Sequence, residues 1–99
     1  MIDILMNLRP RRAIPGELLF KSLESVEEVL FIENGSVDVG YELNDRNKFV
    51  IRLLKGGVIG SYNCTFNVKT KFIYQTRETV QSYVIQKVEW QRIMGINQE

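Results

Sequence analysis

The sequence contains no histidine and a single cysteine, Cys64. One cysteine cannot form a disulfide within the chain, and zinc and haem sites are usually built from clusters of cysteine and histidine. The chain also offers no imidazole that would deprotonate Cys64 for nucleophilic attack. These absences predict no metal centre, no thiol catalysis and a reducing, intracellular compartment.

A charge excess of one sign and long apolar runs are also missing. The 99 residues carry 13 basic and 12 acidic side chains, a formal net charge of +1, which gives no general attraction to nucleic acid. No apolar run approaches the roughly 20 residues that a bilayer-spanning helix needs, so the chain itself is not expected to span a membrane. The length suits one domain over residues 1–99 with a modest core.

Strand periodicity is the main pattern that is present. Apolar side chains alternate with polar ones or glycine from Val37 to Leu43, and Phe49, Ile51 and Leu53 then alternate with Lys48, Val50 and Arg52. This pattern is typical of strands with one buried face. Residues 44–47 are turn formers, so the two arms are expected to form a hairpin. Gly40 inside the first arm indicates a β-bulge.

Other segments complete a mainly β chain. Further strands are predicted over residues 28–33, 71–74 and 80–88, which gives a sheet structure of seven or eight short strands. Helical spacing is confined to short segments near the ends, at residues 2–8 and 88–94, and Gly95 is a suitable stop for the second helix.

Several motifs in register resemble the cyclic-nucleotide-binding domain family. They are Pro15-Gly16-Glu17, Leu30-Phe-Ile-Glu-Asn-Gly-Ser-Val37, Gly60 and the stretch from Val80 to Met94. The resemblance implies a β-roll, that is, a double-stranded antiparallel β-helix or jelly roll, with short terminal helices. Residues 49–60 look most like the domains of nucleotide-gated and voltage-gated cation channels. The family resemblance also implies a non-catalytic regulatory role at the cytosolic face of a membrane or within a larger assembly.

In that family a glutamate accepts a hydrogen bond from the ribose and an arginine pairs with the cyclic phosphate, while backbone N–H groups of a helical turn complete the site. An ungapped comparison puts Ser61 at the glutamate position and Thr70 at the arginine position. The candidate ligand-binding residues, in a degenerate form of this cassette, are Gly60, Ser61, Tyr62, Asn63, Lys69, Thr70, Lys71 and Phe72. No catalytic residue is proposed.

The absence of the family's glutamate and arginine at positions 61 and 70 sets the affinity expected for a cyclic nucleotide. A hydrogen bond to a charged group contributes about 1.5–3 kcal/mol, so losing two weakens binding by roughly a hundredfold to ten-thousandfold. Cyclic AMP and cyclic GMP are therefore expected to bind weakly or not at all, and no other cofactor is expected. Lys69 and Lys71 offer a partial substitute as point charges; the competing interpretation is that both are simply solvated.

An alternative function is a structural or docking subunit. The chain ends at Glu99, where the family's lid helix is expected to begin, and a roll without a lid would expose apolar surface. That surface is expected around Tyr62 and Phe72 and along a stripe formed by Trp90, Ile93 and Met94. The partner would then be the rest of a host polypeptide or another protein subunit. Arg9, Arg11 and Arg12 are interpreted as a solvated segment, with a lipid headgroup or acidic partner as the alternative.

Overall fold

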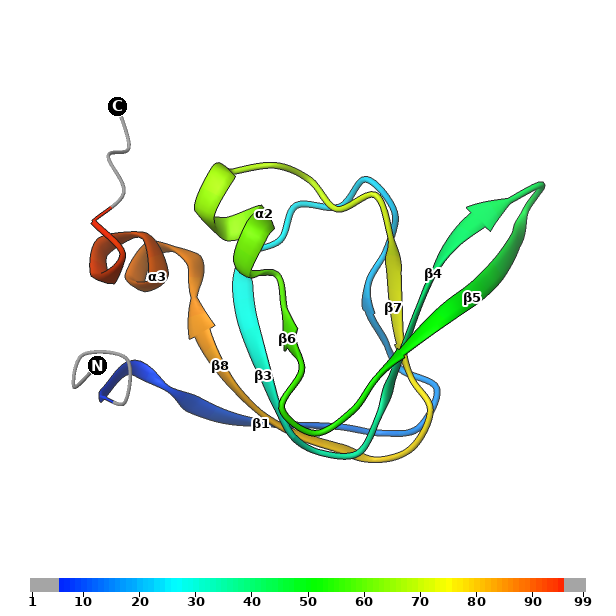
Figure 1. Ribbon diagram of the computed structural model, residues 1–99, viewed down its shortest axis with the longest axis horizontal. Coiled ribbons are helices and arrows are strands. Elements are labelled where there is room, and N and C mark those ends of the chain that lie inside the picture. The colour runs from blue at the N-terminus through cyan, green and yellow to red at the C-terminus, as the bar shows by residue number, and fades with distance from the viewer. Residues whose placement is uncertain (1–5, 96–99) are drawn as a thin grey trace.

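The computed structural model describes residues 6–95, and its two antiparallel sheets pack face to face around one core (Figure 1). The first sheet has the strand order β1-β8-β3-β6 and the second β2-β7-β4-β5. The first sheet's strands are β1 (Arg9–Ala13), β8 (Val80–Gln86), β3 (Glu28–Asn34) and β6 (Val58–Ile59). The second sheet's strands are β2 (Leu18–Phe20), β7 (Ile73–Thr76), β4 (Val37–Leu43) and β5 (Arg46–Leu53).

Two short helices lie at one end of the roll, α2 (Ser61–Phe66) and α3 (Lys87–Ile93). The eight strands of the described residues confirm the mainly β prediction and the β-roll. The helix predicted over residues 2–8 lies largely outside the described residues. None of the described helices is long and apolar enough to cross a bilayer.

Apolar side chains from both sheets form the core. The largest that are completely buried are Val29, Leu30, Val37, Ile59, Val80 and Ile85. Burying a residue of this kind stabilises the fold by about 1.5–3 kcal/mol, so these six positions hold the two layers together.

The β4–β5 hairpin confirms one part of its prediction and corrects another. Asn44 and Asp45 both adopt positive φ, 53° and 63°, as a two-residue hairpin turn requires, so β5 already begins at Arg46. The predicted bulge is present between Val39 and Gly40. A Cβ at Gly40 would overlap the Lys48 carbonyl, which explains the glycine.

The predicted inward face of this hairpin is buried only on β4 and only near the base. Val37 and Val39 are buried, but Leu43 near the tip is 54% exposed, and Ile51, which pairs with Val39, is 58% exposed. The outer half of the hairpin extends beyond the opposite layer (Figure 1), and β5 is the edge strand of its sheet. The sequence alternation therefore extends over positions that the structure leaves exposed.

The terminal helix forms as predicted. It follows β8 directly, and the Gly95 N–H donates to the Arg92 carbonyl at 3.2 Å with φ +72° at the glycine. Trp90 is half-buried and its ring lies 6.4 Å from that of Phe31. The predicted exposed stripe is thus divided, because Trp90 and Ile93 pack on the core while Met94 is 44% exposed.

Candidate functional site

The candidate site begins at Gly60, where the chain turns from β6 into α2. Gly60 has φ +88°, and a Cβ there would lie 2.7 Å from the Glu28 carbonyl oxygen and 2.8 Å from Val26 Cγ1. The helix therefore starts in close backbone contact with the beginning of β3, which only a glycine allows. This contact fixes where the residues after Gly60 lie.

Helix α2 is anchored on one side and exposed on the other. The Cys64 side chain is fully buried, and its thiol donates to the Val26 carbonyl at 3.5 Å. Tyr62 and Phe66 are 65% and 61% exposed, and their rings pair at 4.8 Å between centroids. The helix ends at Asn67 in the left-handed conformation.

Thr70 is the centre of the loop that follows α2. It is 1% exposed, and its hydroxyl both donates to the Phe72 carbonyl and accepts from the Phe72 N–H, each at 3.0 Å. Its own N–H donates to the Glu24 carbonyl at 3.1 Å, and its carbonyl accepts from the Leu23 N–H at 2.7 Å. Thr70 is therefore a structural residue that ties this loop to the segment before β3.

A cavity of about 420 Å³ opens between α2, this loop and β7. Its volume falls in the range of about 300–1,000 Å³ typical of small-molecule sites. The residues that line it are Tyr62, Asn63, Val68, Lys69, Thr70, Lys71, Phe72 and Tyr74. Among these described residues there are two cations, three aromatic rings and no carboxylate, so the wall is basic and aromatic.

The structure brings together six of the eight predicted site residues. Gly60 and Ser61 do not line the cavity; Ser61 is half-buried at the first position of α2. Lys69 and Lys71 are exposed and also line the cavity, so a role as point charges and simple solvation both stay predictions.

Two lining residues, Val68 and Tyr74, were missed by the sequence prediction. Tyr74 follows Thr70 and Phe72 at a spacing of two, and side chains at that spacing share one face of an extended segment. The alternation therefore contained the signal for Tyr74. Val68 carried no comparable signal.

Burial alters the ionisation of two groups near the site. Burial raises the pKa of the Tyr74 phenol, and a hydrogen bond with Thr70 partly offsets this rise. Tyr74 is therefore a neutral hydroxyl in the cavity wall at physiological pH. Burial raises the pKa of the Cys64 thiol to about 11, although the nearby Lys87 lowers it slightly.

We expect the Cys64 shift to appear as a loss of stability in alkaline solution. The folded chain holds the thiol proton up to about pH 11, whereas the unfolded chain releases it from about pH 9. The free energy of unfolding should thus be unaffected by this group below pH 9. Between about pH 9 and pH 11 the free energy of unfolding should then fall by up to about 1.4 kcal/mol per pH unit. Urea unfolding of the wild type and of Cys64→Ala across this pH range measures the fall. Parallel curves of unfolding free energy against pH for the two proteins would contradict the prediction.

Three side-chain hydrogen bonds connect α2 to α3. Trp90 Nε1 donates to Thr65 Oγ1 at 2.9 Å, and Gln91 Nε2 donates to the Cys64 carbonyl at 2.8 Å. The Lys87 ammonium also donates to the side-chain oxygen of Asn67. Because α2 forms one wall of the cavity, a shift of α2 on ligand binding would be passed to α3.

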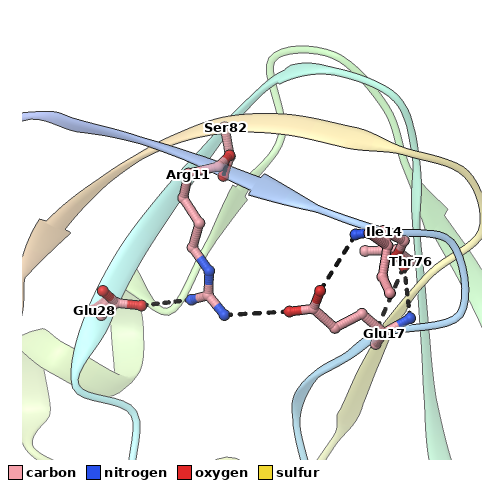
Figure 2. Close-up of polar contacts among 6 residues, drawn as sticks. All are labelled: Arg11, Ile14, Glu17, Glu28, Thr76 and Ser82. Carbon is pink, nitrogen blue, oxygen red and sulfur yellow. Dashed lines mark hydrogen bonds and ion pairs between the residues drawn. The ribbon is translucent and has the colours of Figure 1, made fainter.

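A separate polar cluster centres on Arg11 and has a structural role. Figure 2 shows Arg11 reaching from β1 to Glu28 at 2.7 Å and to Glu17 at 3.6 Å. Thr76 accepts from the Glu17 N–H at 2.9 Å and donates to the Ile14 carbonyl. The interpretation of the three arginines as solvated is therefore wrong for Arg11, because its charge is paired with carboxylates on β3 and in the segment before β2, whereas Arg9 and Arg12 are exposed. Its position on a segment rich in arginine and proline also concealed strand β1 from the sequence prediction.

No other type of site is apparent in the part of the chain that the structure describes. Residues 6–95 contain no group of three or more histidine, cysteine, aspartate or glutamate side chains arranged to hold a metal. A second hollow of about 510 Å³ lies beside Arg11, but its guanidinium already pairs with two carboxylates. The cavity at Thr70 is the better candidate.

No family model and no curated protein matches the sequence, whereas many solved structures share its fold. The regulatory domain of Toxoplasma gondii protein kinase A, with cAMP, matches 93% of this chain and 36% of its own at a TM-score of 0.85 and 9% identity. The second structure is the regulatory subunit of a cAMP-independent protein kinase A from Trypanosoma cruzi, bound to guanosine. It matches 93% of this chain and 33% of its own at a TM-score of 0.82 and 20% identity.

A third structure is a mutant of the regulatory subunit of a cAMP-independent protein kinase A from Trypanosoma brucei, bound to cAMP. In it a glutamate, a threonine and a valine are replaced by alanine, arginine and alanine. It matches 91% of this chain and 34% of its own at a TM-score of 0.80 and 22% identity. The chain thus has the fold of cyclic-nucleotide-binding domains and spans about a third of these proteins. The specific likeness to cation-channel domains stays a prediction.

Proposed function

We propose that this chain is a non-catalytic regulatory domain whose cavity at Thr70 binds a ligand of the nucleoside or nucleotide type. Cyclic AMP and cyclic GMP bind it weakly or not at all. The observation that carries the proposal is the state of Thr70, which occupies the position expected for the phosphate-binding arginine. Its hydroxyl is buried and used within the loop, so it cannot pair with a phosphate.

The ligand class is supported by the shared fold and by the cavity wall. Structures of this fold hold cAMP or guanosine, and in the Trypanosoma brucei mutant cAMP is bound to a protein in which arginine replaces a threonine. The cavity in this chain has the aromatic surface that a base needs. This surface favours recognition of the base, whereas the two exposed lysines offer a phosphate only partial compensation.

A regulatory role is supported by the connection between the two helices. Asn63 lines the cavity from α2, and the next two residues of that helix accept hydrogen bonds from Gln91 and Trp90 on α3. A ligand that repositions α2 would therefore change the position of α3. In our proposal α3 passes this change to the rest of a host polypeptide within the cell, such as a cation channel.

Thermal unfolding in the presence of ligand tests this proposal. A ligand at one hundred times its Kd stabilises a protein by about 2.7 kcal/mol, which for a domain of this size raises the melting temperature by at least about 10 °C. With cyclic AMP or cyclic GMP at millimolar concentration we expect a rise below about 3 °C, which corresponds to a Kd no tighter than the ligand concentration. A rise above about 10 °C with either would contradict the proposal of weak binding.

The second candidate is a docking subunit, and exposed apolar side chains favour it. Tyr62, Phe66, Val88 and Met94 on the two helices are between 44% and 65% exposed, and exposed apolar patches commonly mark interaction sites. A docking subunit should show no thermal response to any nucleoside or nucleotide. The same experiment, extended to nucleosides, therefore separates the two functions.

A further inference from the structure

We infer that the cavity takes an uncharged purine nucleoside in preference to a cyclic nucleotide. This inference rests on the proposed function, because it names the ligand class of the same cavity. It follows from where the charges lie, from the aromatic surface and from the neutral polar groups in the wall.

The distribution of charge disfavours a phosphate inside the cavity. The cations that line it are Lys69 and Lys71, and both are exposed. The buried part of the wall is formed by Thr70, whose hydroxyl is engaged, and by the half-buried Tyr74 and Asn63, none of which is a cation. An anion moved from water to this surface would lose hydration without a buried cation to compensate it.

The aromatic residues supply the surface for a flat base. Phe72 is 47% exposed and lines the cavity, so part of its ring is open to a ligand. Its backbone N–H and carbonyl are both held by the Thr70 hydroxyl, which fixes the backbone from which the ring projects before a ligand arrives. Tyr62 and Tyr74 place two further rings in the wall. A purine offers a larger stacking area than a pyrimidine, which favours the purine class.

The polar groups in the wall suit neutral hydroxyls and ring atoms. The Tyr74 phenol is protonated at neutral pH, as an ordinary tyrosine is, so it can donate to a neutral oxygen or nitrogen. The Lys69 and Lys71 ammonium groups can donate in the same way at the rim. The cavity of about 420 Å³ thus offers stacking at its wall and neutral hydrogen bonding around it.

Titration calorimetry on the full chain tests the inference. The probes are guanosine, adenosine and cytidine, each compared with cyclic GMP and cyclic AMP. We expect a purine nucleoside to bind at least about tenfold more tightly than either cyclic nucleotide or cytidine, a difference of about 1.4 kcal/mol. Phe72→Ala should weaken nucleoside binding roughly 5- to 150-fold, the effect of losing a base–aromatic stack.

Control variants keep each outcome interpretable. Lys69→Gln with Lys71→Gln keeps a hydrogen-bond donor at each rim position and removes the charge, so it should weaken cyclic nucleotide binding more than nucleoside binding. If Phe72→Ala lowers the melting temperature, Tyr62→Ala repeats the stacking test, because Tyr62 is 65% exposed and its loss should disturb the fold less. Tighter binding of a cyclic nucleotide would overturn this inference and keep the ligand-binding function. Binding of no probe would overturn both and leave the docking role.

Discussion

The Ser61→Glu, Thr70→Arg double variant is expected to bind cyclic AMP about 10 to 150 times more tightly than the wild type. The arginine restores one hydrogen bond that involves a charged group, which contributes roughly 1.5–3 kcal/mol, whereas position 61 lies outside the cavity wall and is expected to add nothing. Thr70 lines the cavity, so an arginine there can extend into it. Titration calorimetry with cyclic AMP measures the gain.

The double variant should also unfold more easily. Arginine removes the hydroxyl that bonds both the N–H and the carbonyl of Phe72, at a cost of about 1–3 kcal/mol. Ser61→Gln with Thr70→Met is the matched control, because it adds similar bulk without charge and should gain no affinity. A folded double variant that binds no more tightly than this control contradicts the role assigned to position 70. In that case Phe72→Ala in the same background would show whether the Phe72 ring fills the cavity.

Gly60→Ala is expected to lower the free energy of unfolding by about 2–5 kcal/mol. The left-handed φ of +88° costs an alanine about 1–2 kcal/mol, and overpacking adds about 1–3 kcal/mol. The added Cβ would lie 2.7 Å from the Glu28 carbonyl oxygen, a backbone atom that cannot move aside cheaply. Chemical denaturation measures the loss.

Gly56→Ala is the matched control for this prediction. Gly56 has φ +92° but no atom within 4 Å of an added Cβ, so it carries the conformational cost without the overlap. We expect it to lose about 1–2 kcal/mol. Equal losses at the two positions would show that the close contact between Gly60 and β3 contributes nothing to stability.

The fold could be predicted largely because its signals are local. Alternation over residues 37–43, turn formers at residues 44 and 45 and the glycine at the bulge each follow from backbone geometry in a few residues. Burial at the hairpin tip could not be predicted, because it depends on how far the opposite layer extends. Strand β1 was missed because Arg11 appears solvated in sequence and is ion-paired in the structure.

The site could be predicted in position more readily than in detail. Motif register located most of the residues that line the cavity, since six of the predicted residues do so. The burial of Thr70 could not be read from the sequence, because its bonds run to Leu23 and Glu24 in a distant loop. The exclusion of Ser61 from the cavity wall likewise depends on the rotation of α2 about its axis.

Backbone amide NMR chemical shifts, followed while a purine nucleoside is added to the wild-type chain, test the central claim most directly. The account predicts saturable changes concentrated at residues 62–63, 68–72 and 74, which line the cavity. Smaller changes should reach Trp90 and Gln91 through their hydrogen bonds to α2. Saturable changes centred on the Arg11 cluster, or no changes at saturating nucleoside and cyclic nucleotide, would contradict it.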